Sequence, residues 1–234
     1  MATIVHIDTS TPVTSIAVSR DGLVIFEKQN EGKDGMSQAS ELVGTYCDEA
    51  MQLIEQDKLK VDAVCVSSGP GSYTGLRIGT SLAKGMAYGL DAHLIAIPTL
   101  EVLCVPVLLE HEIEDNALLC PMIDARRMEV FAAVYDRRLN SVRQTKADIV
   151  DNETYREYLN EHTVYFFGNG AVKCKDGIKQ PNAHFIENIV PLAKNMMPLA
   201  EKRMRVRNYV DVAYFEPDYG KEYKAKLPTN KLTR

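Results

Sequence analysis

The run Ser68-Gly-Pro-Gly-Ser-Tyr-Thr-Gly-Leu-Arg-Ile-Gly79 separates an apolar segment, residues 61–66, from a stretch rich in small residues, 75–89. The apolar segment is typical of a buried strand, and the stretch after the run has the spacing of a helix. Three glycines within residues 69–75 let the backbone turn tightly between the two. N–H groups at a helix N-terminus attract a phosphate or carboxylate. Glycines also allow a second helix to pack very closely, so the loop is either an anion cradle or a packing platform.

Working outward, the residue pattern predicts a similar order of elements in the two parts of the chain. In the first part we expect strands at 3–8, 15–19, 23–27, 61–66 and 93–97, with helices at 37–56, at 75–88 and from 99. In the second part we expect strands at 117–124, 128–135, 139–144, 164–167 and 184–186, with helical stretches at 153–159 and 191–204. A repeated order of this kind predicts duplicated halves.

Short motifs support the duplication. Ile7-Asp8 and Ile123-Asp124 are each followed, nine and ten positions after the aspartate, by an Ala-Val pair. Gly69-Pro-Gly71 and Gly168-Asn-Gly170 both follow the fourth strand of their half. We therefore expect an α/β fold with a first half over 1–103, a degenerate second half over 104–216 and a basic tail over 217–234.

Composition and charge limit the function classes. The chain has 234 residues and a formal net charge of −5, which argues against a dedicated nucleic-acid binder. Residues 201–234 carry nine Lys/Arg against five Asp/Glu, a net +4, so the rest carries −9. The five cysteines are far apart and form no C-x-x-C pair, which is typical of a reduced compartment. Without a signal-like start or an apolar run of roughly 18–20 residues, we expect a cytoplasmic protein that does not contact a membrane.

Three motifs, Ile7-Asp-Thr-Ser10, the run at 68–79 and Ile123-Asp-Ala-Arg-Arg-Met-Glu-Val-Phe131, resemble the TsaB (YeaZ) family of the actin/hexokinase/Hsp70-like superfamily. The resemblance implies two ribonuclease H-like halves, each a mixed five-stranded sheet with helices. It also implies a non-catalytic role in making threonylcarbamoyladenosine (t6A), the modified adenosine beside the tRNA anticodon. The implied partners are a TsaD-like paralogue, which transfers the threonylcarbamoyl group, and a TsaE-like ATPase. The resemblance further implies a heterodimer with TsaD, a homodimer when the chain is alone, and only indirect contact with tRNA.

The same superfamily holds a nucleotide phosphate and its Mg²⁺ with an aspartate at the end of the first strand and the turn after it. By that resemblance, and by the glycine loop, the candidate nucleotide or anion site comprises Asp8, Thr9, Ser10, Gly69, Gly71, Ser72 and Thr74. The loop matches neither G-x-x-x-x-G-K-[ST] nor a dinucleotide fingerprint. TsaD-like proteins hold their metal with an H-x-x-x-H pair on the first long helix, whereas residues 37–56 contain no histidine. We expect no catalytic residue, no cofactor and no metal.

The small residues after the loop favour the packing platform. Gly75, Gly79 and Ala83 recur at four-residue spacing, and glycine inside a helix costs about 0.5–1 kcal/mol relative to alanine. Close contact with another helix would offset that cost. We therefore expect the helices at 37–56 and 75–89 to lie side by side on the outer face of the first half and to bind a TsaD-like partner. The expected interface residues are Ala39, Val43, Gly44, Cys47, Gly75, Ile78, Gly79, Leu82, Ala83 and Met86.

Three other functions stay open from the sequence. A free-standing ATP-dependent phosphotransferase of the same superfamily would place Asp8 near Mg²⁺ and the glycine loop on phosphate. A peptidase would need a histidine paired with a nucleophile, and none is evident. An independent tRNA binder is disfavoured by the acidic balance of residues 1–200. The segment Phe215-Glu-Pro-Asp-Tyr219 matches a Pro-x-Tyr segment of the family and has no assigned mechanism.

Overall fold

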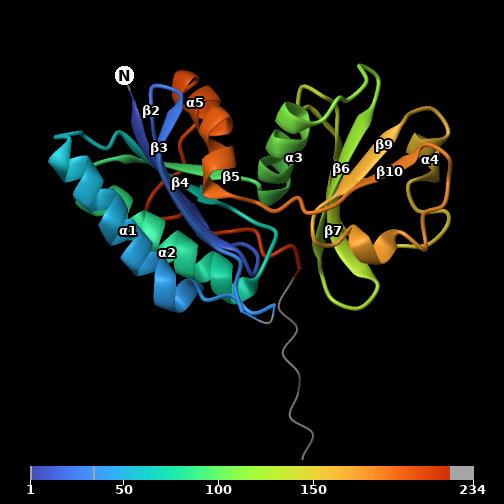
Figure 1. Cartoon of the computed structure of the whole chain (residues 1–234), viewed down its shortest axis with the longest axis horizontal. Coiled ribbons are helices and arrows are strands. Elements are labelled where there is room, and N and C mark those ends of the chain that lie inside the picture. Colours follow the sequence, from blue (N-terminus) through green and yellow to red (C-terminus); the bar gives the residue numbers. More distant parts are fainter. Residues whose placement is uncertain (1, 34, 222–234) are drawn as a thin grey trace, which may run out of the picture.

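Two five-stranded sheets form the frame of the molecule (Figure 1). The computed structural model describes residues 2–33 and 35–221, so most of the expected basic tail, residues 222–234, lies outside the described residues. The first half contains β1 (Thr3–Asp8), β2 (Thr14–Arg20), β3 (Leu23–Asn30), α1 (Ala39–Gln56), β4 (Ala63–Ser67), α2 (Tyr73–Gly89), β5 (His93–Ile97) and α3 (Thr99–Glu110). The rest of the described chain contains β6 (Leu118–Asp124), β7 (Glu129–Tyr135), β8 (Ser141–Ile149), α4 (Arg156–Leu159), β9 (Val164–Phe167), η1 (Val172–Cys174), β10 (Ala183–Ile186), η2 (Ala193–Met196) and α5 (Met197–Arg205), where η marks a 3-10 turn.

Both sheets have the same topology. The strand order is β3-β2-β1-β4-β5 in the first sheet and β8-β7-β6-β9-β10 in the second. In each sheet the first three strands of the half are antiparallel neighbours, and the remaining two continue in parallel from the first strand. The expected α/β fold, with two similar halves and mixed five-stranded sheets, is confirmed.

The two halves differ by one residue in the register of their first hairpin. Ile7 on β1 pairs with Ile16 on β2, whereas Ile123 on β6 pairs with Phe131 on β7. The hairpin partner is therefore nine residues later in the first half and eight residues later in the second. The equally spaced Ala-Val pairs do not occupy equivalent positions, so that part of the sequence argument is wrong. The evidence for duplicated halves is instead the matching strand order of the two sheets.

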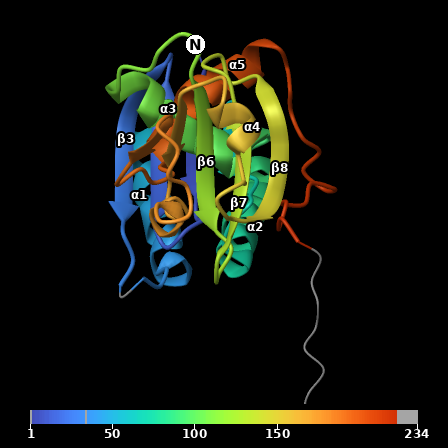
Figure 2. The same ribbon diagram turned by 90° about the vertical axis from the view of Figure 1, so that its right-hand side faces the viewer.

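Helices separate the sheets and cover their outer faces (Figures 1 and 2). α1 and α2 cover the outer face of the first sheet, and α4 and η1 cover the second through Leu159 and Cys174. α3 lies between the sheets. It packs on the first sheet through Val102 and on the second sheet through Leu103, and Leu199 of α5 also packs on the first sheet. A helix that is apolar all round is typical of burial on two sides. Among the described residues, no helix combines the length and the apolar character needed to cross a bilayer.

Several elements differ from their expected bounds, among them β8 and two helical segments. β8 continues to Ile149 instead of ending at 144. The helical structure before β9 is limited to the four residues of α4, because Tyr155 adopts a left-handed conformation with φ of 70°. The helix expected from 191 begins at 193 as a 3-10 turn, since Leu192 is extended, and α5 follows with Pro198 in its first turn.

Candidate functional site

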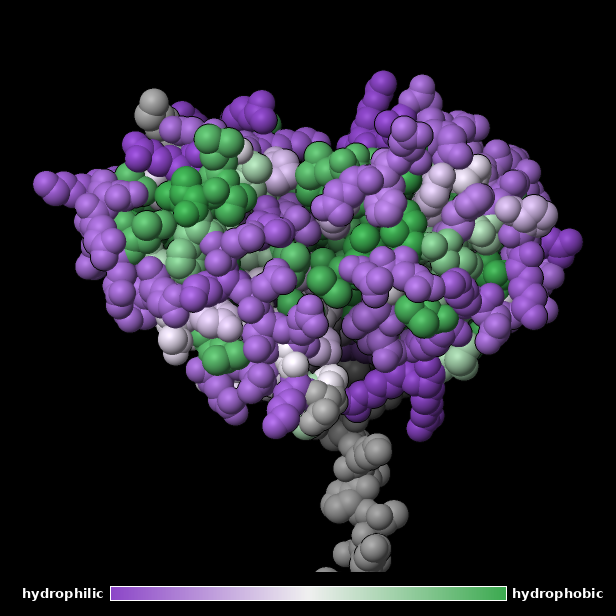
Figure 3. Space-filling view, in the orientation of Figure 1, coloured by the Kyte–Doolittle hydropathy of each residue, from purple (hydrophilic) through white to green (hydrophobic). Residues whose placement is uncertain are grey.

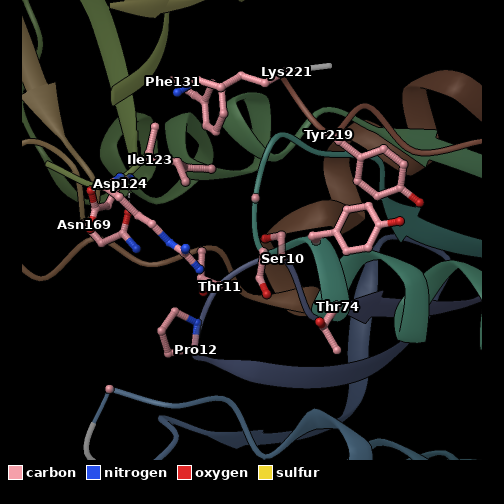
Figure 4. A pocket seen from close by; sticks show the side chains of 16 residues that line it. Ser10, Thr11, Pro12, Thr74, Ile123, Asp124, Phe131, Asn169, Tyr219 and Lys221 are labelled. Atoms are coloured by element: carbon pink, nitrogen blue, oxygen red, sulfur yellow. Dashed lines mark hydrogen bonds between the residues drawn. The ribbon is translucent and has the colours of Figure 1, made fainter. Parts of the chain in front are cut away.

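A cleft of about 750 Å³ lies between the two halves, where the loops after β1, β4, β6 and β9 face one another (Figure 4). Ser10 and Thr74 line it from the first half, and Asp124 and Asn169 line it from the second. Tyr219 and Lys221, near the end of the described chain, complete the wall. A concave site between two halves, with several convergent polar groups, is the default location for a ligand.

Asp8, the expected magnesium-binding residue, does not reach this cleft. Its carboxyl group is fully buried, and its Oδ1 accepts hydrogen bonds from the N–H (3.0 Å) and hydroxyl (2.9 Å) of Ser10. Burial raises the pKa of Asp8 to about 7, although the bonds from Ser10 act in the opposite direction. Asp8 does not line the cleft, so its carboxyl group is not placed to hold a cation there.

The glycine loop is bonded to the turn after β1 instead of enclosing a space. The N–H of Ser72 donates to the Ser10 carbonyl (2.7 Å), and a Cβ at Gly71 would overlap that same carbonyl oxygen. Thr9 Oγ1 donates to the Gly75 carbonyl (2.6 Å), and Ser72 Oγ caps α2 by accepting from the Gly75 N–H (3.3 Å). Of the expected anion-binding residues, the structure buries Asp8, Thr9 and Gly69 away from the cleft, whereas Ser10, Gly71, Ser72 and Thr74 line it.

The second half places an exposed aspartate where the first half has Asp8. Asp124 pairs with Lys173 of η1, whose ammonium also donates to the carbonyls of Arg127 (2.6 Å) and Glu129 (2.7 Å). The lysine therefore holds the turn between β6 and β7 in place. The Asp124 N–H donates to Asn169 Oδ1 (3.0 Å), which ties this turn to the loop after β9. Sequence reasoning missed Lys173 because it lies 49 residues beyond the aspartate.

The structure places six of the ten expected interface residues in the interior. These six are buried and are Ala39, Val43, Cys47, Gly75, Gly79 and Ala83. A Cβ at Gly75 would overlap the Thr9 carbonyl oxygen, and one at Gly79 would overlap Thr9 Oγ1. The close neighbour that these glycines require is the turn after β1. In the isolated chain these six residues are therefore not exposed to a partner.

The other four lie at the junction between α1 and α2. Glu49 on α1 pairs with Lys28 on β3 (2.9 Å), so that flank of α1 faces the sheet edge. Successive residues are about 100° apart around a helix axis, so Gly44 and Met51 lie roughly 140–160° from Glu49 around α1, on the flank toward α2. A shared surface results, which we call the α1–α2 face, formed by Gly44, Met51, Ile78, Leu82, Gly85 and Met86. Its long side chains are half-buried, and a Cβ at Gly44 or at Gly85 would meet no atom within 4 Å.

Another apolar surface lies on the edge strand of the first sheet. In Figure 3 hydrophobic colour gathers over β3, where Leu23 is 69% exposed and Ile25 is 39% exposed. The surface over α1 in the same view is mostly hydrophilic. The α1–α2 face thus combines half-buried apolar side chains with two exposed glycines.

Comparison with known proteins places this architecture in a family. The family described as "TsaD: tRNA N6-adenosine threonylcarbamoyltransferase" matches residues 36–222. The tRNA threonylcarbamoyladenosine biosynthesis protein TsaB of Bacillus subtilis is 34% identical over 62% of this chain and 60% of its own length. The protein of the same name from Escherichia coli is 26% identical over 92% of this chain and 93% of its own length. The match to the Haemophilus influenzae TsaB spans 62% of that protein.

Two solved structures from Pseudomonas aeruginosa share the fold. YeaZ superposes with a TM-score of 0.73, and a protein described as similar to peptidase YEAZ superposes with a TM-score of 0.78. Each is 20% identical to this chain and covers 94% of it and all of the solved chain. The chain belongs to the family described as "TsaD: tRNA N6-adenosine threonylcarbamoyltransferase", and it is similar to the proteins named TsaB and to YeaZ.

Proposed function

We propose that this chain is a non-catalytic subunit of the machinery that forms t6A on tRNA, and that it binds a TsaD-type transferase. The names of its relatives and of the matching family support a place in t6A formation. In this proposal the α1–α2 face binds the transferase, or a second copy of this chain when the transferase is absent. A TsaE-like ATPase joins the complex, and tRNA is contacted through the transferase.

One observation carries the partner surface: within the described part of the chain, no close contact requires glycine at Gly44 or Gly85, both in the middle of a helix. A glycine inside a helix costs about 1 kcal/mol relative to alanine. At Gly75 and Gly79 the tight packing on the turn after β1 offsets that cost, but at Gly44 and Gly85 a methyl group would find open space. A second protein that approaches closely over these two positions supplies the missing compensation.

The site chemistry favours a subunit over an enzyme. A phosphotransferase of this superfamily would need the Asp8 carboxylate in the cleft, and it is fully buried instead. Within the described parts of the chain, no three His, Cys, Asp or Glu side chains gather closely enough to hold a metal ion. The free-standing phosphotransferase therefore remains the less supported function.

Leucine substitutions at Gly44 and Gly85 test the proposal. Gly44→Leu and Gly85→Leu should leave the isolated chain folded, because both positions face open space. Each should weaken binding to the TsaD-type protein of the same cell by about tenfold or more, measured by calorimetry. Lys146→Leu, at an exposed position on β8, controls for added apolar bulk.

Two results would contradict the proposal. Normal affinity of both leucine variants would exclude the α1–α2 face as the binding surface. Steady ATP turnover by the purified chain alone would exclude the non-catalytic role and restore the phosphotransferase.

A further inference from the structure

Residues 210–221 cross from the first half of the molecule to the second and form one wall of the cleft (Figure 4). We call this segment the strap. It begins at Val210, which pairs with Leu94 on β5, and it runs past α2 and the glycine loop. It ends at Lys221, which pairs with Glu129 on β7. The strap includes the Phe215–Tyr219 motif, to which the sequence assigned no role.

The first part of the strap is anchored to the first half. Val210, Val212 and Phe215 pack against the core cluster beneath α1 and α2. Lys84 on α2 donates from Nζ to the carbonyl oxygens of Ala213 (3.0 Å) and Phe215 (3.1 Å). Apolar burial together with two charge-assisted hydrogen bonds makes this part a firm attachment.

The middle of the strap rests on the glycine loop. The N–H of Asp218 donates to the Ser68 carbonyl (2.7 Å), and a Cβ at Gly69 would overlap the Asp218 carbonyl oxygen. Gly69 also has a φ of +101°, which a residue with a side chain rarely adopts. Gly69 therefore provides the space in which the strap lies.

The end of the strap reaches the second half through a small contact. Gly220 packs so closely on the Phe131 ring that a Cβ would lie 2.5 Å from it. Lys221 lies over the same ring, 5.5 Å from its centroid, and its side chain is 41% exposed. On the side of the first half, the ring centroid of Tyr219 lies 4.6 Å from that of Tyr73, the first residue of α2. Exposed ion pairs and cation–π contacts are individually weak, and salt screens them.

We propose that the strap is a separately opening unit, in which residues 216–221 release both the second half and the Ser68 carbonyl while residues 210–215 stay anchored, and that the cleft opens by this motion. The unequal attachment supports it, since half-buried apolar side chains and two hydrogen bonds from Lys84 hold the first part. The end is held by one backbone hydrogen bond, the contact of Gly220 with the Phe131 ring and a partly exposed ion pair. Because Tyr219 and Lys221 form one wall, a group that enters from that side displaces them first. The proposal concerns the isolated chain and does not depend on the proposed function.

Hydrogen exchange of the purified chain, followed by mass spectrometry, tests the strap. Amides at 216–221 should exchange about 100-fold or more faster than those of β1, because they open without global unfolding. Raising the salt from about 0.05 to 0.5 M should speed their exchange further, since it screens the pair of Lys221 with Glu129. Equal exchange rates in the strap and β1 would overturn the proposal.

Gly220→Ala is the opening variant, because its new methyl group meets Phe131 at a φ of +71°. It should raise exchange at 216–221 by about tenfold or more and leave β1 unchanged. Tyr214→Ala is the matched control in the same segment, since Tyr214 is 85% exposed, and its exchange should equal that of the wild type. If Gly220→Ala speeds exchange in the strap and in β1 together, the strap is an integral part of the fold and the proposal fails.

A fluorescence measurement checks the same motion independently. The chain contains no tryptophan, so Tyr219→Trp introduces a single reporter at the cleft wall. Acrylamide should quench this tryptophan more strongly when Gly220→Ala is added. Unchanged quenching in a variant with native circular dichroism would overturn the proposed detachment.

Discussion

Gly79 on α2 lies against Thr9 so closely that a Cβ at residue 79 would overlap the Thr9 hydroxyl oxygen. That hydroxyl donates to the carbonyl of Gly75, one turn earlier in the same helix (2.6 Å). The backbone of α2 therefore packs directly against the Thr9 side chain in the turn after β1. Gly85 lies on the outward side of α2, and a Cβ at this residue would meet no described atom within 4 Å.

Alanine at these two positions should have opposite effects. Gly85→Ala should raise the free energy of unfolding by about 0.5–1 kcal/mol, because it improves helix propensity without a collision. Gly79→Ala should lower it by about 1–3 kcal/mol, because the buried Thr9 hydroxyl must move and lose its hydrogen bond. Urea denaturation of both variants measures the difference. Equal shifts in both would mean that α2 does not depend on its contact with the turn.

The same pair of glycines shows how far the sequence reaches. Spacing and small residues correctly predicted the helix, and β-branched runs such as residues 3–8 correctly predicted the strands of both sheets. Four-residue spacing shows that a helix face needs a close neighbour, but it does not identify that neighbour. Thr9 is 70 residues from Gly79, and only the pairing of β1 with β4 brings them together. Gly85, two residues after Ala83 in the same helix, lies outside that spacing and has no described atom within 4 Å of where its Cβ would be.

His6 and Asp8, two residues apart on β1, are both fully buried ionisable groups. Burial lowers the pKa of His6 to about 3 from an ordinary 6.5, and it raises the pKa of Asp8 to about 7 from 3.8. Between pH 3 and 6.5 the unfolded chain binds a proton at His6 that the folded chain does not, so stability rises with pH. Between pH 3.8 and 7 the folded chain keeps a proton at Asp8 that the unfolded chain releases, so stability falls with pH. In the overlap the two effects offset each other.

Asp8→Asn should reveal the pH dependence of stability that the His6 titration causes. Asparagine keeps an oxygen that accepts from Ser10 and removes the titration. Between about pH 4 and 6.5 the free energy of unfolding of the variant should then rise by about 1.4 kcal/mol per pH unit relative to the wild type. Chemical denaturation at several pH values measures the slope. Parallel profiles of variant and wild type would mean that Asp8 is ionised in the folded chain.

His6→Gln should give the opposite slope. The amide can still hydrogen-bond to the Ser19 hydroxyl, which lies 2.7 Å from His6 Nε2. With the histidine titration removed, stability should fall by about 1.4 kcal/mol per pH unit between about pH 4 and 6.5 relative to the wild type. The same denaturation series measures it. Parallel profiles of the variant and the wild type would contradict the neutral state of His6 in the fold.

The candidate site was predicted less well than the fold. The motif at 7–10 correctly marked the end of the first strand, but a motif does not show whether its carboxyl group faces a cleft or its own turn. Asp8 and Asp124 follow the same Ile-Asp pattern, yet one is buried and the other is exposed. The strap has no helical or strand periodicity, so nothing in its sequence indicated that Tyr219 and Lys221 complete a cleft. These features depend on contacts between distant segments.

Lys173 should be worth far more to stability than its neighbour Lys175. The Lys173 ammonium pairs with Asp124 and donates to two carbonyl oxygens, and its side chain is 23% exposed. Lys173→Met leaves those carbonyls without their donor, so we expect a loss of about 1–3 kcal/mol in the free energy of unfolding. Lys175 pairs only with Glu187, and both side chains are about half exposed, so Lys175→Met should change stability by less than about 0.5 kcal/mol. Urea denaturation of the two variants provides the comparison, and equal losses would mean that the ammonium does not hold the turn between β6 and β7.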